Sequence, residues 1–269
     1  MYSIGEFSNL VGVTSGTLRS YEKYNILIPF KNETNSYRFY NDLDARTLLI
    51  SRWYRSMGFS VEETAEMIQK TCLNQSKKGI EKLIDDLKIE IDEKSLKLQR
   101  LKEIESDITS IDKQLDHCSI ELFEGYYRFD QTNQNKMIKD HDMEPQISAW
   151  MSYLPFTHFT FKMEYEKCSE SVKSKEYTWG MTLSAKYTDA LKVNTSHPLI
   201  GYYPEQMSAT TIISVKKEEL LSSNHLDKLF TFIEEHNFKV SGDIIGRFIL
   251  NDCIDSQEVG YCKVYIPIR

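Results

Sequence analysis

The chain has 269 residues, of which 41% are hydrophobic and 27% charged, the balance of a soluble globular protein that can bury a substantial core. It holds no run of about 18 apolar residues and no N-terminal secretory pattern, so we expect neither a membrane span nor export. Five scattered cysteines, an odd number, favour the reducing cytoplasm over a disulfide framework. The net charge of −7 excludes a uniformly basic nucleic-acid coat but leaves room for a local basic face.

Aromatic residues divide the chain into three predicted parts. Residues 76–118 contain none and are rich in Lys, Glu, Asp, Leu and Ile, whereas residues 119–269 contain 21. An aromatic-free segment of that composition is typical of a long exposed helix. We therefore expect a small N-terminal domain over 1–75, a helical rod over 76–118 and an aromatic-rich domain over 119–269.

The first part has the pattern of a winged helix-turn-helix. Helical apolar spacing from Ile4 to Val11 ends at Gly12, and Thr14 then suits the N-cap of a second helix. A polar run around Pro29 predicts a hairpin, the wing, between strands at 26–28 and 37–40. The recognition helix and wing would present these DNA-contacting side chains: Thr14, Ser15, Thr17, Arg19, Tyr21, Lys23, Tyr37, Arg38, Tyr40 and Arg55.

Three motifs in order make residues 2–70 resemble the MerR family of transcriptional regulators. They are Thr17-Leu18-Arg19-Ser20-Tyr21-Glu22 with Leu27 and Pro29, then Tyr37-Arg38-Phe39-Tyr40 with Asp44, then Arg55-Ser56-Met57-Gly58-Phe59-Ser60. The resemblance departs from the family pattern at three positions, where Ser20 replaces an aromatic residue, and Asn25 and Ser36 replace glycines.

The remaining apolar side chains of this part are expected to form its core. They are Leu18, Tyr24, Leu27, Phe39, Leu48, Trp53 and Met57. Arg52, like Arg55, is open to either interpretation, a phosphate contact or a solvated face.

The rod, from about Lys77 to His117, carries an apolar stripe at steps of three and four residues. About forty residues make a helix of roughly 60 Å, too long to be covered by a small neighbouring domain. We expect an antiparallel coiled coil in a homodimer. A helical hairpin, or a helix lying along its own domain, is the alternative.

The last part predicts a compact α+β domain. Strict alternation over 158–165 indicates a strand, and further strands are expected at 210–216, 247–250 and 260–268, with helices at 144–154 and 227–237. The C-terminal segment 263–268 and residues 177–181 resemble the GyrI-like effector-binding domain. Together with a MerR-like head, this resemblance implies a multidrug-sensing regulator with an aromatic-lined cavity.

Candidate ligand-binding residues follow from aromatic chemistry, because such rings stack on flat molecules and attract cations. They are Tyr127, Trp150, Tyr153, Phe161, Glu164, Trp179, Tyr261 and Tyr265. In the family that this segment resembles, many members have Glu at the position of Lys263. Either Glu164 or Glu121 supplies the counter-ion for a cationic drug, or the ligand is neutral or anionic.

The resemblance implies a cytoplasmic, homodimeric regulator, most simply an activator, with no cofactor and no enzymatic activity. It would bind promoter DNA, act on RNA polymerase, and distort the promoter when a bulky lipophilic effector binds. Three alternatives stay open: a metal or redox sensor using Cys72, Cys118 and His117, a small-molecule hydrolase, and an architectural protein without a ligand.

Overall fold

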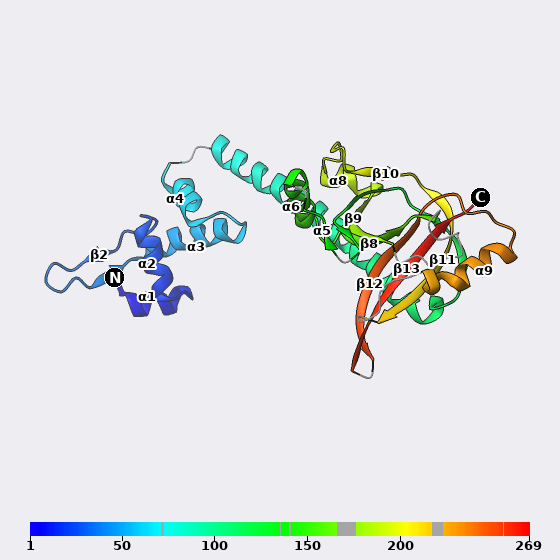
Figure 1. Cartoon of the computed structure of the whole chain (residues 1–269). Helices are drawn as coiled ribbons and strands as arrows, with labels where there is room; N and C mark the ends of the chain where they lie inside the picture. Colours follow the sequence, from blue (N-terminus) through cyan, green and yellow to red (C-terminus); the bar gives the residue numbers. More distant parts are fainter. Residues whose placement is uncertain (71–72, 135, 140, 166–175, 217–222, 255) are drawn as a thin grey trace. The chain divides into compact units, whose positions relative to one another are not determined.

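The computed structural model describes residues 1–70, 73–134, 136–139, 141–165, 176–216, 223–254 and 256–269. It divides into two compact units, residues 1–94 and 95–269, and one long helix contributes to both (Figure 1). Among the described residues, no helix is both long enough and apolar enough to cross a bilayer.

The N-terminal unit is a helix-turn-helix with a small three-stranded sheet, in the strand order β1-β3-β2. Its elements are β1 (Tyr2–Ser3), α1 (Ile4–Val11), α2 (Ser15–Lys23), β2 (Phe30–Lys31), β3 (Arg38–Tyr40), α3 (Asp42–Ser56) and α4 (Val61–Gln69). The predicted helices and wing are present, but the first wing strand begins after Pro29. Ile26 and Leu27, expected in that strand, are buried in the connection before it.

Side-chain caps fix where these helices begin. Ser3, Asn41 and Ser60 each form a capping box with an acidic residue three positions on, and Thr14 accepts a hydrogen bond from the Thr17 amide. Such caps satisfy backbone N–H groups that have no partner within the helix.

Both residues that replace a family glycine stand at left-handed backbone positions. Asn25 has φ 55° and Ser36 has φ 56°. Asn enters this region more readily than other residues with a side chain, so the chain keeps its turn after α2 without glycine.

The rod is a single helix, α5 (Leu73–Gln114), of 42 residues. In the part of α5 that belongs to the first unit, up to residue 94, most side chains are exposed. In the part that belongs to the second unit, Arg100 and Ile111 are buried. The predicted long helix is thus present, and its C-terminal part packs on its own domain.

The C-terminal unit is built on an eight-stranded sheet whose strand pairs are antiparallel, in the order β10-β5-β9-β8-β12-β13-β11-β4. In chain order these strands are β4 (Ser119–Phe123), β5 (Tyr126–Asp130), β8 (Thr157–Met163), β9 (Thr178–Ser184), β10 (Gly201–Tyr203), β11 (Gln206–Lys216), β12 (Ile244–Ile254) and β13 (Gln257–Pro267). The expected strands are all present, and β11 and β12 run longer than expected.

Short elements complete this unit. They are the hairpin β6 (Thr132–Asn133) and β7 (Lys136–Met137), the 3-10 turns η1 (His141–Met143), η2 (Ala185–Tyr187) and η3 (Ser223–Leu226), and the helices α6 (Glu144–Ser152), α8 (Thr188–Leu191) and α9 (Asp227–Glu235). Both expected helices, α6 and α9, are therefore present.

The two faces of the sheet differ in chemistry because strand side chains alternate. One face is apolar: Phe161, Val264 and Ile266 pack there with Leu229 and Ile233 of α9, and a second cluster packs around Trp150 of α6. The other face carries polar and charged residues and receives the C-terminal part of α5, where Ile111 contacts the cluster of Ile212 and Tyr261.

Candidate functional site

The exposed part of the recognition helix α2 is small and basic. Arg19 and Lys23 are exposed, and Thr14 and Thr17 share a hydrogen bond of 2.9 Å between their hydroxyl oxygens. Ser15 is half-buried. The Thr14 hydroxyl therefore caps the start of the helix, and both threonine hydroxyls lie near its outer surface.

Tyr21 and Tyr40, expected on the DNA-binding surface, lie in the core. Tyr40 is fully buried and stacks on Phe7 with ring centroids 4.6 Å apart, while Tyr21 is 5% exposed in the same cluster. This corrects the sequence expectation, because a domain of this size needs these rings to fill its interior. Conversely, Trp53, expected in the core, lies on the outer side of α3 and is 59% exposed.

The wing is tied to the recognition helix by charge. Arg38 Nε donates to Glu22 Oε2 at 2.6 Å, and Lys31 Nζ lies 2.5 Å from Glu22 Oε1. The hydrogen bond from Arg38 holds the pKa of Glu22 below its usual value. Tyr37 is exposed at the wing, whereas Arg55 donates to the Phe59 carbonyl and so supports the start of α4. Arg38 therefore positions the wing.

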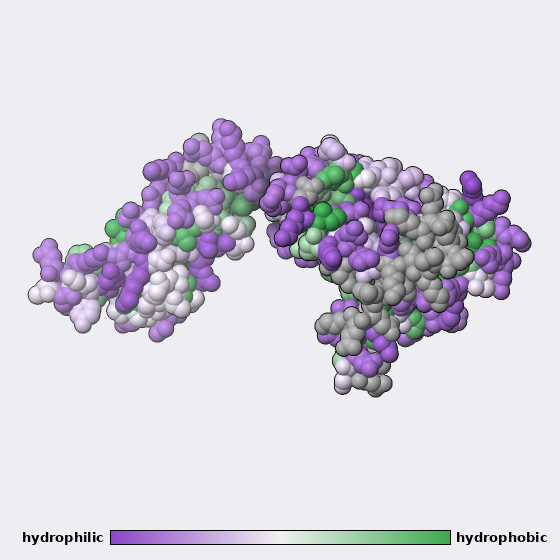
Figure 2. Space-filling view, in the orientation of Figure 1, coloured by the Kyte–Doolittle hydropathy of each residue, from purple (hydrophilic) through white to green (hydrophobic). Residues whose placement is uncertain are grey.

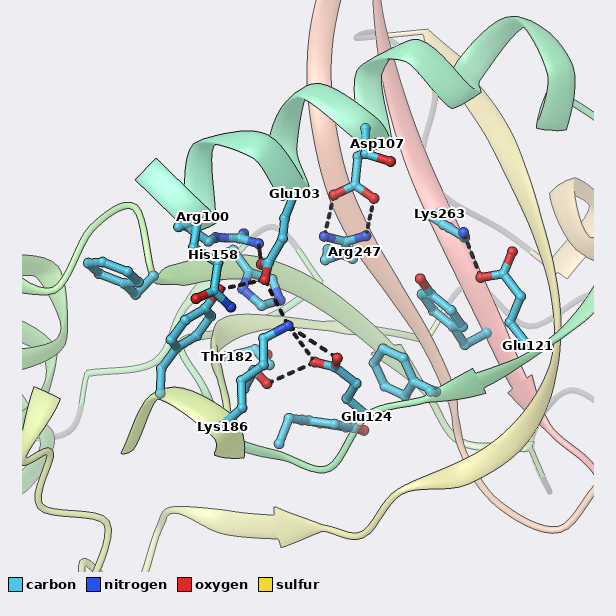
Figure 3. A pocket seen from close by; sticks show the side chains of 18 of the residues that line it. Arg100, Glu103, Asp107, Glu121, Glu124, His158, Thr182, Lys186, Arg247 and Lys263 are labelled. Carbon is cyan, nitrogen blue, oxygen red and sulfur yellow. Dashed lines mark hydrogen bonds and ion pairs between the residues drawn. The ribbon is translucent and has the colours of Figure 1, made fainter. Parts of the chain in front are cut away.

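The C-terminal unit holds a cavity of about 520 Å³ between the polar face of the sheet and α5 (Figure 3). Helix α5 supplies one wall with Arg100, Glu103 and Asp107, and the sheet supplies the floor. A volume of this size suits a drug-sized molecule.

Strand register places a row of polar side chains along the cavity floor. His158 on β8 stands opposite Thr182 on β9, while Arg247 on β12 stands opposite Lys263 on β13. Residues directly opposite in neighbouring strands share one face. All four line the cavity.

One ion pair joins the wall of the cavity to its floor, and a second lies within the sheet. Arg247 donates two hydrogen bonds to Asp107, each 2.6 Å long, and Lys263 Nζ lies 2.7 Å from Glu121 Oε2. Bidentate Arg–carboxylate pairs of this geometry are among the strong polar contacts in proteins. The sheet thereby holds α5 through charge as well as through packing.

Glu103 on α5 is the second point of attachment. It accepts a hydrogen bond from the Tyr187 hydroxyl at 2.7 Å, and it pairs with Lys186 and Arg100 at 3.0 Å each. Lys186 also pairs with Glu124 at 2.9 Å. These partners lower the pKa of Glu103, against the opposing effect of its burial.

His158 contributes a neutral polar group to the floor. Burial is the main cause that lowers its pKa well below the usual value, and the nearby Arg247 and Arg100 add to it. The imidazole is therefore uncharged near neutral pH. Its buried Nδ1 has no hydrogen-bond partner among the described residues.

Two stacked aromatic pairs stand at the cavity. Phe123 stacks on Tyr265 with centroids 4.1 Å apart, and Tyr126 stacks on Tyr203 at 4.8 Å. Phe123, Tyr126 and Tyr265 line the cavity. The site thus combines a charged floor with an aromatic edge.

Of the eight residues predicted to bind ligand, Tyr265 lines this cavity, and Tyr261 shares its face of the sheet within the Ile111 cluster. Phe161 and Trp179 belong to the apolar face under α9, and Trp150 and Tyr127 to the cluster at α6. Tyr153 is half-buried and Glu164 is exposed, and neither lines the cavity. Composition identified the aromatic side chains, but it could not predict which face of the sheet each one lies on, and so whether it belongs to the core or to the cavity.

Most of the charged lining was not among the predicted ligand-binding residues. Arg100, Glu103 and Asp107 lie in the predicted rod and Arg247 lies in a predicted strand, and none of them was given a role. One available signal was the alternation around His158, which places Thr160 on the same face. The pairing of distant strands was not available from sequence.

Of the residues named for the alternative metal or redox site, the structure describes His117 and Cys118. Cys118 is a half-buried free thiol whose pKa is raised by burial, and Cys72 lies outside the described residues. In the described part of the chain, no three His, Cys, Asp or Glu side chains are grouped to hold a metal ion.

Comparison with known proteins bears on the N-terminal part. Residues 2–71 match the model of the MerR HTH family regulatory protein. The HTH-type transcriptional regulator HmrR of Sinorhizobium medicae is 41% identical over 66 residues, 24% of this chain and 45% of HmrR. Within this match, the described residues 2–70 form a MerR-type helix-turn-helix domain.

A second curated relative and a solved structure are less similar in sequence. The HTH-type transcriptional activator TipA of Streptomyces coelicolor is 33% identical over 67 residues, 25% of this chain and 26% of TipA. The chain spans about half the length, or less, of these curated relatives. A solved EcmrR–DNA complex aligns over 100% of this chain and 99% of its own, with 16% identity and a TM-score of 0.36.

Proposed function

We propose that this chain is a cytoplasmic, homodimeric transcriptional regulator that binds promoter DNA through its MerR-type domain and responds to a small molecule held in the C-terminal cavity. The single observation that carries the proposal is the position of α5. This helix leaves the MerR-type unit and, in its C-terminal part, forms a wall of the cavity. A molecule in the cavity therefore contacts the element that continues into the DNA-binding unit.

The GyrI-like character of the C-terminal domain belongs to this proposal. It is supported by the motif resemblance and by the cavity between an antiparallel sheet and a helix. The effector would act by differential affinity, since a ligand shifts a conformational equilibrium only as far as it prefers one state. In the activator form of the proposal, the dimer then deforms the promoter for RNA polymerase, at a cost of order 1–6 kcal/mol.

DNA binding is tested with duplex DNA flanking the protein's own gene, by fluorescence anisotropy at several salt concentrations. Arg19→Ala should weaken binding across sequences and flatten the salt dependence, because a lost phosphate contact releases fewer counterions. Lys88→Ala, an exposed cation on α5, is the control and should change neither. An Arg19 variant with wild-type affinity and salt slope would contradict the assigned surface.

Effector binding is tested by thermal-shift screening of the full chain against lipophilic dyes, because a ligand of the folded state raises its melting temperature. Ser184→Trp places an indole at the cavity edge and should abolish the shift. Thr231→Trp, on the exposed side of α9, should retain it. Equal shifts in both variants would place the dye elsewhere, and no shift with any dye would favour an architectural protein without an effector.

A further inference from the structure

The charge arrangement in the cavity indicates which class of effector it takes, an inference that rests on the proposed function. Lys263 rises from β13, a central strand, and its side chain is 8% exposed. Its ion-pair partner among the described residues is Glu121, at 2.7 Å. Its ammonium also lies 5.7 Å from the centre of the Tyr265 ring. The cation is thus fixed and buried beside an aromatic surface.

The partner of Lys263 is held less firmly. Glu121 lies on β4, an edge strand of the sheet, and its side chain is 34% exposed. Its other carboxylate oxygen accepts a long hydrogen bond of 3.4 Å from Gln114. Glu121 can therefore exchange this ion pair for water at small cost, whereas Lys263 cannot, because an unpaired buried charge is strongly unfavourable.

This asymmetry decides between ligand charges. An anionic group that displaces Glu121 leaves the buried ammonium paired and releases a carboxylate toward solvent. A cationic group that pairs with Glu121 takes the counter-ion from Lys263 and adds a like charge beside it. The same displacement is harder at Arg247, which Asp107 holds with two hydrogen bonds of 2.6 Å.

The rest of the lining agrees with an anion. Five cationic side chains line the cavity against four carboxylates: Arg100, Lys102, Lys186, Arg247 and Lys263 against Glu103, Asp107, Glu121 and Glu124. His158 is neutral and leaves this balance unchanged. The Phe123 and Tyr265 rings stack on each other, and the Tyr265 ring centre lies 5.7 Å from the Lys263 ammonium, so these rings offer a surface to an apolar body beside the cation.

We propose that the effector is an organic acid, an aromatic or otherwise apolar molecule bearing a carboxylate, sulfonate or phosphate group, and that its anion replaces Glu121 at Lys263. The Tyr265 and Phe123 rings contact the apolar body. Glu121 acts as an internal counter-ion that keeps Lys263 paired until the effector arrives.

A matched pair of fluorescent probes tests this on the full-length protein. Anilinonaphthalene sulfonate carries the anion, and N-phenyl-1-naphthylamine has the same ring system without it. Lys263→Met should lower the affinity for the sulfonate probe at least about tenfold and leave the neutral probe unchanged. Glu121→Gln should raise the affinity for the sulfonate probe alone. Lys216→Met, an exposed lysine on β11, is the control and should change neither.

The exchanged pair Lys263→Glu with Glu121→Lys keeps one ion pair but buries the carboxylate. It should reverse the preference, so that a cationic probe such as tetraphenylphosphonium binds more tightly than the sulfonate. One outcome would overturn the assigned effector class but not the effector site. In that outcome, Ser184→Trp abolishes binding of the neutral probe, while Lys263→Met and Glu121→Gln leave the affinity for the sulfonate probe unchanged. If neither probe binds the wild-type cavity, the proposed effector site itself fails.

Discussion

Burial sets the chemistry of individual side chains in the C-terminal unit. Cys262 lies on the apolar face of β13, where burial raises the pKa of its thiol to about 12, whereas Cys253 on β12 is exposed. The reactive species is the thiolate, so the two thiols should differ widely in reactivity although both are free.

We therefore expect iodoacetamide at pH 8 to alkylate Cys253 rapidly and Cys262 slowly in the folded protein. At this pH the Cys262 group lies far below its raised pKa and stays protonated, and its burial also excludes the reagent. Peptide mass spectrometry over a time course measures both rates, and unfolding in urea should bring them close together. Comparable rates in the folded protein would contradict the assigned burial.

Gly246 shows how closely one residue can define the packing of the sheet. A Cβ added there would lie 1.9 Å from a ring carbon of Phe161, far inside normal contact distance. Gly246 stands opposite Phe161 in the β12–β8 pairing, so the missing side chain makes room for the ring.

Gly246→Ala should therefore destabilise the C-terminal unit by about 1–3 kcal/mol, the usual cost of overpacking a core. Urea unfolding followed by tryptophan fluorescence measures the change. Gly5→Ala on α1, where the added methyl meets nothing within 4 Å, is the matched control and should not destabilise the protein. A Gly246 variant as stable as the wild type would show that the ring moves aside freely.

At the scale of elements, α5 carries an apolar stripe with heptad spacing that its own chain leaves exposed. Ile84, Leu87, Ile91, Leu98, Leu101 and Ile108 occupy successive seam positions, and each is more than 40% exposed. Lys94 and Glu105 interrupt the seam. Such a stripe favours pairing with a second copy, the homodimer of the proposed function.

Ile91→Asp should accordingly convert the dimer to monomer, because it places a charge in the seam. Size-exclusion chromatography with light scattering measures the mass. Ile89→Asp is the control: Ile89 is 58% exposed, like Ile91 at 54%, but lies off the seam, so this variant should stay dimeric. Dimers for both variants, or monomers for the wild type, would refute the coiled-coil pairing.

At the scale of the whole molecule, the polar contacts that hold α5 to the sheet belong to the second unit. Arg247–Asp107 and Lys186–Glu103 lie within residues 95–269, whereas the MerR-type core around Phe7 and Leu48 lies within the first unit. A change at one of these ion pairs should therefore act on one unit's stability and not on the other's.

Asp107→Asn removes the partner of a largely buried guanidinium and should cost the C-terminal unit about 3 kcal/mol. Differential scanning calorimetry should show that the transition of this unit falls while that of the MerR-type unit stays in place. Lys113→Gln, near the end of α5, is the control and should move neither. Equal shifts of both transitions would mean that the two units unfold together.

The sequence by itself determined the MerR-type domain, the long helix, the helices α6 and α9, and four of the eight strands of the large sheet: β8, β11, β12 and β13. These features depend on residues close together in the chain: the motif at Thr17–Glu22, the cap at Thr14, the stripe of α5, and the alternation from His158 onward. Local pattern and local hydrogen bonding suffice for them.

Only the tertiary structure decided which side chains meet in the cavity. Arg247 and Lys263 are 16 residues apart in sequence, on the paired strands β12 and β13, and Asp107 of α5 lies 140 residues before Arg247. A shift of one residue along a strand moves a side chain to the opposite face. On β8, for example, His158 and Phe161 are an odd number of residues apart and lie on opposite faces of the sheet. Tyr21 and Tyr40, which were predicted to contact DNA, lie in the core for the same physical reason. Burial depends on long-range packing that no local pattern encodes.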